Sequence, residues 1–109
     1  MNDQSAALEE KRRALLNAGV KMMDPSAVYV EETVTVGAGT LLLPGTILRG
    51  NTVVGENCEI GPNVMLTSCT VGAGTTINAS QCEESTIEAG CQIGPYTHIR
   101  PHCVVGEGS

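Results

Sequence analysis

The feature that most constrains this chain is a large aliphatic residue that recurs about every six positions from Val30 onward. Three of the steps are five residues long and the others are six. The repeated positions, called anchors below, are Val30, Val36, Leu42, Leu48, Val54, Ile60, Leu66, Val71, Ile77, Cys82, Ile87, Ile93, Ile99 and Val105. Such a period is typical of a hexapeptide β-helix, which winds as a prism with one short strand on each side. With three sides per turn, or coil, the anchors predict just under five coils.

A second column of residues lies four positions after the anchors, and all but Gln81 are Val, Thr, Cys or Ser. These residues are Val34, Thr40, Thr46, Thr52, Cys58, Val64, Thr70, Thr75, Gln81, Thr86, Cys91, Thr97, Cys103 and Ser109. Small residues at this position suit the tightly packed interior of a narrow prism. An antiparallel β-domain would instead alternate every two residues, so the period favours the β-helix.

Glycine and asparagine recur three positions after the anchors, where the prism must turn its corners. They stand at Gly39, Gly45, Asn51, Asn57, Asn63, Gly74, Gly90 and Gly108. These residues adopt left-handed backbone angles at low cost, so we expect them at the sharp turns. The period does not determine the hand of the coil.

The N-terminal segment differs from the rest and predicts a helix over residues 3–18. Ala, Leu, Glu, Lys and Arg dominate it, and Gly19 is well placed to end it. We therefore expect a linker or capping helix in residues 1–20 and a β-helix over residues 21–109. The last repeat stops one residue short of a complete hexad, which suggests that the β-helix is truncated at its C-terminal end.

Composition excludes several classes of function. The net charge is −6, and Trp and Phe are absent, so we expect neither nucleic acid nor a membrane as a partner. No secretory signal is visible, which favours the cytoplasm. The five cysteines contain no Cys-x-x-Cys pair, which argues against a disulfide framework or a zinc ribbon. Four of them fit the interior columns as small apolar residues, whereas Cys69 fits neither column and has no predicted role.

Candidate binding residues are few, because only two cations follow Lys21. Arg49 and Arg100 each come directly after an anchor and are separated by three coils. We expect them on one outer face, roughly 14 Å apart at the usual strand spacing. Arginine suits phosphate or carboxylate recognition, although either residue could also be ordinary surface charge. His98 and His102 lack a third ligand, so no metal site is predicted.

Three segments resemble the bacterial bifunctional enzyme that acetylates glucosamine-1-phosphate and then uridylylates N-acetylglucosamine-1-phosphate. They are Gly-Val-x-x-x-Asp-Pro at 19–25, Pro-Gly-Thr at 44–46 and Gly-Pro-Tyr-x-x-x-Arg-Pro at 94–101. The resemblance covers Ala14 to Ser109 and corresponds to the C-terminal hexapeptide-repeat domain. It implies a left-handed β-helix, a homotrimer and a helix leading from an upstream nucleotidyltransferase domain.

The resemblance also implies site residues and cofactors. Arg100 matches the arginine that contacts the sugar phosphate, whereas Arg49 matches no family site. Where the family has Arg-Pro-Gly, this chain has His102 after Pro101. The catalytic His, a second phosphate-binding Lys and the acetyl-CoA contacts would lie beyond Ser109, and the nucleotidyltransferase domain has no counterpart. No catalytic residue is therefore assigned, and acetyl-CoA is implied only for the full-length family enzyme.

The leading hypothesis is thus that the chain is part of a bifunctional enzyme of UDP-N-acetylglucosamine biosynthesis. This enzyme is a glucosamine-1-phosphate N-acetyltransferase and N-acetylglucosamine-1-phosphate uridylyltransferase. The chain is expected to be inactive alone but to bind a sugar phosphate, either glucosamine-1-phosphate or UDP-N-acetylglucosamine, through Arg100. Whether the chain is itself an enzyme stays open. The alternative is a non-catalytic trimeric scaffold or sugar-phosphate-binding module. A metal-dependent hexapeptide enzyme would need three converging histidines, and the chain has two.

Overall fold

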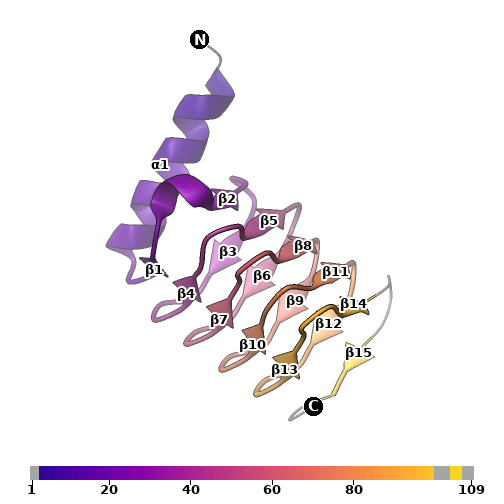
Figure 1. The fold of residues 1–109 in the computed structure, drawn as a ribbon. Coiled ribbons are helices and arrows are strands. Elements are labelled where there is room, and N and C mark those ends of the chain that lie inside the picture. Colours follow the sequence, from indigo (N-terminus) through magenta and orange to yellow (C-terminus); the bar gives the residue numbers. More distant parts are fainter. Residues whose placement is uncertain (1–2, 100–103, 107–109) are drawn as a thin grey trace.

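The computed structural model describes residues 3–99 and 104–106, which form a helix followed by three parallel sheets of five strands each (Figure 1). Sheet A contains β1 (Lys21–Met22), β4 (Leu41–Leu42), β7 (Glu59–Ile60), β10 (Thr76–Ile77) and β13 (Gln92–Ile93). Sheet B contains β2 (Tyr29–Val30), β5 (Ile47–Arg49), β8 (Met65–Thr67), β11 (Gln81–Glu83) and β14 (His98–Ile99). Sheet C contains β3 (Thr35–Val36), β6 (Val53–Val54), β9 (Thr70–Val71), β12 (Thr86–Ile87) and β15 (Val104–Val105).

Successive strands pass from sheet A to B to C, so each coil places one strand in every sheet. In Figure 1 the coil axis runs from upper left to lower right. The chain crosses the near side from β4 to β5 and returns through the fainter β6 to β7, which is a left-handed winding. The structure is therefore the predicted left-handed parallel β-helix of about five coils, with a short N-terminal helix.

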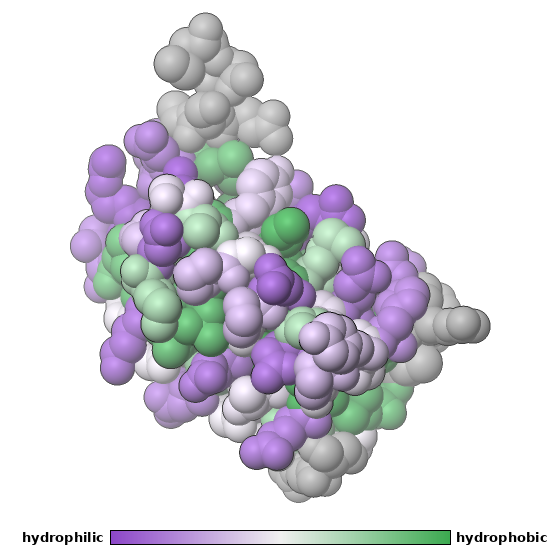
Figure 2. All heavy atoms as spheres, viewed as in Figure 1, coloured by the Kyte–Doolittle hydropathy of each residue, from purple (hydrophilic) through white to green (hydrophobic). Residues whose placement is uncertain are grey.

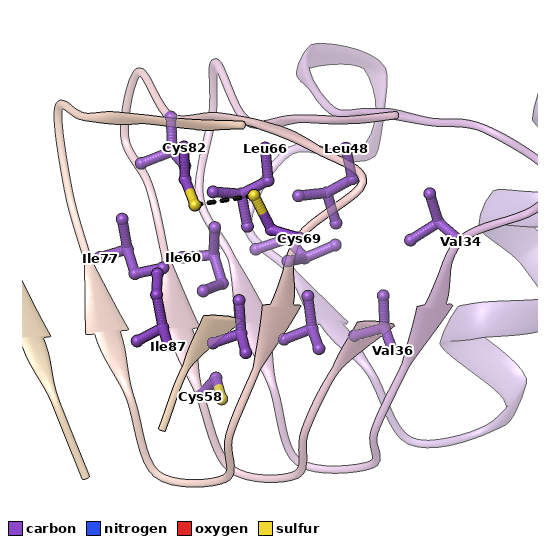
Figure 3. Packing of buried hydrophobic residues seen from close by; sticks show 14 of the residues in the cluster. Val34, Val36, Leu48, Cys58, Ile60, Leu66, Cys69, Ile77, Cys82 and Ile87 are labelled. Atoms are coloured by element: carbon purple, nitrogen blue, oxygen red, sulfur yellow. Dashed lines mark hydrogen bonds between the residues drawn. The ribbon is translucent and has the colours of Figure 1, made fainter. Parts of the chain in front are cut away.

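The anchors form the core, as the sequence predicts. Every anchor from Val30 to Ile99 is buried, and Val105 packs against them partly buried. The strand register stacks anchor on anchor, for example Leu48 on Leu66 in sheet B. Figure 3 shows these side chains pointing inward from all three sheets. The six-residue period thus encodes a continuous apolar column.

The small-residue column needs a correction at the three short steps. Thr70, Gln81 and Thr86 were expected inside, but their side chains are exposed on the sheet faces. The buried small residues stand one position earlier, at Cys69, Ser80 and Ser85. In each five-residue step, the residue that is missing relative to a six-residue step lies between the anchor and the small residue, so the small residue comes three positions after the anchor and not four. This finding gives Cys69, which had no predicted role, a place in the interior column.

Residues with a positive φ turn the corners of the prism, and the structure shows which residue does so in each corner. Glycine or asparagine has a positive φ at the predicted positions 39, 45, 57, 63, 74 and 90. The prediction was wrong at Asn51, where Gly50 takes the left-handed angle with a φ of 67°. In the short corners the turning residues are Ser68, Ala79 and Glu84, with φ values of 52°, 44° and 43°. Position 108 lies outside the described residues.

Buried threonines hydrogen-bond one coil to the next. The Thr40 hydroxyl donates to the Gly55 carbonyl at 2.7 Å and accepts from the backbone N–H of Cys58 at 3.1 Å. The Thr52 hydroxyl donates to the Arg49 carbonyl at 2.7 Å and accepts from the N–H of Cys69 at 3.2 Å. A hydroxyl therefore satisfies backbone groups that the corners leave out of the strand ladders, and its burial costs little.

Helix α1 (Asp3–Asn17) packs on the first coil and ends as the sequence predicts. Gly19 has a φ of 96° and its N–H donates to the Leu16 carbonyl, while the N–H of Val20 donates to the Leu15 carbonyl. This is a Schellman motif, and its usual apolar contact is provided by Leu15 and Val20, both buried in the core cluster. Arg12 adds a hydrogen bond from Nη1 to the Pro25 carbonyl at 2.6 Å.

Strand β1 adds one side that the anchors did not predict. Met22 pairs with Leu42 in sheet A, although it lies eight residues before Val30. The extra length is absorbed by a 3₁₀ turn, η1 (Pro25–Ala27), which Asp24 caps by accepting from the Ser26 N–H at 3.2 Å. Among the described residues, no helix has the length and apolar character needed to cross a membrane.

Candidate functional site

The outer face of sheet B carries a row of polar side chains directly after the anchors. The row runs along the coils through Glu31, Arg49, Thr67 and Glu83. Backbone pairing places Arg49 beside Thr67 and Thr67 beside Glu83. Cys82 pairs with Ile99, the last described residue of strand β14. Arg100, the predicted sugar-phosphate residue, lies outside the described residues.

Arg49 lies on the predicted face and is held by its neighbours in the row. Its Nη2 donates to Thr67 Oγ1 at 3.3 Å, and its Nε is buried without a hydrogen-bond partner. Within residues 3–99 and 104–106, Arg49 makes no ion pair. The nearby Glu31 carboxylate instead accepts from the Gly50 N–H at 2.8 Å. The guanidinium is thus packed against the sheet.

His98 and Glu83 form a cross-coil pair on the same face. His98 Nε2 lies 3.1 Å from Glu83 Oε1, and the two side chains are 51% and 45% exposed. The described residues contain no group of three or more side chains suited to hold a metal ion. His102, the other histidine considered, lies outside them. His98 therefore engages a carboxylate of the preceding coil on the outer face of sheet B.

A shallow hollow lies where the corners between sheets A and B meet the C-terminal strands of sheet B. Its volume is about 420 Å³, and neutral side chains and His98 line it. The lining residues are Asn63, Ala79, Ser80, Gln81, Tyr96, Thr97 and His98. Tyr96 is 90% exposed at a φ of 63°. Figure 2 shows that the near face of the molecule mixes hydrophilic and hydrophobic residues without a single broad apolar area.

This arrangement can bind but offers little chemistry of its own. After Lys21, Arg49 is the one cation among the described residues. The sequence did not identify Glu83 as the partner of His98, because that pairing depends on the register between coils. The exposed Tyr96 was also missed as a feature of the surface, since it stands where Gly or Asn usually turns the corner.

Comparison with known proteins places this chain. Residues 25–109 match the family model described as "GMPPB C-terminal domain". The chain is 42% identical over 106 residues to the "Bifunctional protein GlmU" of Synechococcus elongatus, covering 96% of this chain and 24% of that protein. It is 45% identical over 89 residues to the protein of the same name from Alkaliphilus oremlandii, covering 82% and 20%.

A third relative of that name, from a Geobacillus species, is 43% identical over 90 residues, covering 83% of this chain and 19% of that protein. The chain thus spans about a quarter or less of the length of the curated relatives it matches. These relatives confirm the resemblance carried by the three sequence segments. The chain belongs to the family of the GMPPB C-terminal domain and is a relative of the bifunctional GlmU proteins.

Proposed function

We propose that this chain is part of the cytoplasmic system that makes UDP-N-acetylglucosamine, as a glucosamine-1-phosphate N-acetyltransferase and N-acetylglucosamine-1-phosphate uridylyltransferase. Its own part in that system is to bind the sugar phosphate. The observation that carries the proposal is 42% identity to a bifunctional GlmU protein across nearly the whole chain.

Arg100 holds the phosphate in this proposal. Its guanidinium forms charge-assisted hydrogen bonds to the phosphate oxygens, which are stronger than neutral ones. A carboxylate close to the phosphate would oppose binding, and Glu83 is the last described residue of the row on the outer face of sheet B. The contact between His98 and Glu83 at 3.1 Å gives that carboxylate another partner. His98 thus supports the site indirectly and is not the catalytic base.

Titration of the isotope-labelled chain with glucosamine-1-phosphate, followed by NMR, tests this role. Arg100→Ala should weaken binding about 10-fold or more, because a hydrogen bond to a charged group contributes about 1.5–3 kcal/mol. Arg49→Ala is the matched control and should bind as the parent chain does. Glucosamine without its phosphate should bind neither protein. Equal affinity of Arg100→Ala and the parent chain would refute the assignment.

A scaffold that assembles as a homotrimer is the second candidate, and the outer face of sheet C favours it. Its outward side chains before the anchors are Thr35, Val53, Thr70, Thr86 and Val104. After the anchors come Gly37, Gly55, Gly72, Glu88 and Gly106, so Glu88 is the one charged residue on this described face. In an acidic protein, a flat and nearly uncharged sheet face suits contact with further copies of the chain.

Analytical ultracentrifugation tests the assembly. Val53→Lys places a charge on β6, where the Val53 side chain is 43% exposed, and should shift a trimer towards monomer. Glu59→Gln on the outer face of β7 in sheet A removes a charge elsewhere and should leave the assembly unchanged. A monomeric parent chain at high concentration would eliminate the scaffold proposal but not the binding one.

A further inference from the structure

Two cysteines from consecutive coils meet inside the β-helix. Cys69 is the small residue at a corner between sheets B and C, and Cys82 is the sheet B anchor of the next coil. The same diagonal contact one coil earlier joins Thr52 to Leu66, where the Thr52 hydroxyl lies 3.4 Å from the Leu66 carbonyl. The fold therefore brings the corner residue to the following anchor, and here both positions carry sulfur.

The two sulfur atoms lie closer than ordinary packing requires. Cys69 Sγ and Cys82 Sγ are 2.7 Å apart, and the two residues are 0% and 2% exposed. Non-bonded heavy atoms in a protein core usually lie about 3.5–4.0 Å apart, whereas a disulfide bond is about 2.05 Å long. Figure 3 shows the two thiols pointing at each other across the interior. The separation is intermediate between packing and a covalent bond.

The other buried cysteines in the described residues make a different contact. Cys58 Sγ lies 3.2 Å from the Gly72 carbonyl oxygen, and Cys91 Sγ lies 3.0 Å from the Gly106 carbonyl oxygen. Each of these thiols can donate to a carbonyl of the next coil, as the threonines of the same column do. The hydrogen bonds of Cys58 and Cys91 go to carbonyl oxygens and not to a second sulfur, so these two cysteines are matched controls for burial and position.

The contact with Cys82 also changes the acidity of Cys69. The side-chain hydrogen bond between Cys69 and Cys82 lowers the pKa of the Cys69 thiol from 9.0 to about 7, against the opposing effect of burial. A thiolate is the nucleophilic form of cysteine, so a lower pKa makes Cys69 the attacking sulfur at neutral pH.

We propose that Cys69 and Cys82 are a peroxide-sensitive dithiol that oxidises to a disulfide between two coils. The Cys69 thiolate attacks one oxygen of hydrogen peroxide, the O–O bond breaks, and the departing hydroxide is protonated to water. Cys69 is then a sulfenic acid. Cys82 Sγ attacks Cys69 Sγ, the S–O bond breaks, and a second water leaves. Two thiols and one peroxide thus give one disulfide and two waters.

Burial determines which oxidant can react. Hydrogen peroxide is small and uncharged, so it can reach sulfur atoms enclosed by one layer of strands. Glutathione disulfide is large and charged, and thiol–disulfide exchange requires access to the attacking sulfur. The Cys69–Cys82 pair should therefore react with hydrogen peroxide and not undergo thiol–disulfide exchange with bulky disulfides. The disulfide would join two residues that are 13 positions apart in the chain. Such a cross-link stabilises the folded state mainly by restricting the conformations of the unfolded chain.

The test is oxidation of the reduced full chain with one equivalent of hydrogen peroxide, followed by thiol titration in denaturant and peptide mapping. Two of the five thiols should disappear, with a peptide linked through Cys69 and Cys82. The rate should rise with pH through about 7, and the melting temperature should increase by roughly 5–10 °C. Glutathione disulfide in the same time should leave all thiols intact.

Substitutions by residues that occur at equivalent positions of other coils test the disulfide without disrupting the fold. Cys69→Thr uses the residue found at other corners, and Cys82→Val uses a residue found at other anchors, so both should fold. Each should abolish the bridge, whereas Cys58→Thr and Cys91→Thr should retain it. The proposal is overturned if peroxide leaves Cys69 and Cys82 as thiols, stops at a sulfinic or sulfonic acid, or links other cysteines instead.

Discussion

The corner that joins sheet C to sheet A is the same in every coil, whereas the two corners that flank sheet B vary. Four C-to-A corners turn at Gly39, Asn57, Gly74 and Gly90, always three residues after the anchor. All three short steps fall at corners next to sheet B, where Ser68, Ala79 and Glu84 take the positive φ. The irregularities are therefore confined to one side of the prism.

The difference separates a repeated turn from a variable surface. At the regular corners a Cβ on Gly37, Gly55 or Gly72 would lie 2.6, 2.7 or 2.4 Å from a backbone nitrogen of the next coil, so adjacent backbones approach closely there. A varied corner can be as tight, since a Cβ on Gly94 would clash with the Asn78 carbonyl oxygen. The varied corners nevertheless adjoin the sheet B strands that carry the candidate site, and the exposed Tyr96 turns one of them.

The largest effect should come from filling a regular corner. Gly72→Ala would place its Cβ 2.4 Å from the Ala89 nitrogen, and relieving that clash requires the coils to separate. We expect the free energy of unfolding to fall by about 2–3 kcal/mol, measured by chemical denaturation. Gly74→Ala is the control in the same corner, since nothing lies within 4 Å of its Cβ and only its φ of +72° is strained.

The control should lose about 1 kcal/mol, the usual cost of a left-handed angle for alanine. A Gly74→Ala loss as large as that of Gly72→Ala would mean that backbone angle, and not coil spacing, limits the regular corner.

The next largest effect should come from removing a buried threonine hydroxyl, and it can be compared between the two kinds of corner. Thr52→Val beside sheet B removes a donor to the Arg49 carbonyl and an acceptor for the Cys69 N–H. Thr75→Val in a C-to-A corner removes a donor to the Glu88 carbonyl of the next coil and an acceptor for the Cys91 N–H. Each should destabilise by about 1–2 kcal/mol in thermal or chemical melts, because a buried N–H loses its partner.

Thr35→Val on the outer face of β3 is the control and should change stability by less than about 0.5 kcal/mol. If Thr52→Val is as mild as this control, the corners beside sheet B are relaxed enough to admit water.

A gain is expected at the short corners. Ala79 has a φ of 44°, so Ala79→Gly should stabilise the fold by about 0.5 kcal/mol once the greater flexibility of unfolded glycine is subtracted. Ala73, at a regular corner with ordinary backbone angles, provides the opposite control: Ala73→Gly should destabilise by a similar amount. The same sign for both changes, in parallel denaturation curves, would contradict the assignment of strain to the short corners.

The smallest effect concerns Tyr96, which turns a corner of normal length at a φ of 63°. Tyr96→Asn copies the equivalent Asn63 and should change stability by less than about 0.5 kcal/mol, since the ring is 90% exposed. A large loss in the melting temperature would show that the ring is covered, for instance by another copy of the chain.

The sequence predicts the interior well because the interior is set by local repetition. Leu48 or Ile60 can be assigned to the core from the six-residue period alone. The period fails at Thr70, Gln81 and Thr86, since a five-residue step does not reveal which position of the corner is missing. Asn51 and Gly50 are both good turning residues, and only the backbone shows that Gly50 turns.

The site is less predictable because it depends on which residues lie beside one another in different coils. The pairings of Arg49 with Thr67 and of His98 with Glu83 join residues that are 18 and 15 positions apart. Cys69 and Cys82 are adjacent for the same reason. These distances along the chain follow from the number of short corners between the partners, which must be located before contacts can be counted.

Because the cross-section has three sides, the number of sides that precede a strand determines which sheet it joins. An insertion or deletion of three sides, however many residues its corners contain, returns every later strand to the sheet it occupied before. A change of one side would move each later strand to the next sheet, so residues that had faced one surface would face another. Variation in the length of such chains should therefore occur in whole coils, while single residues are gained or lost only within corners.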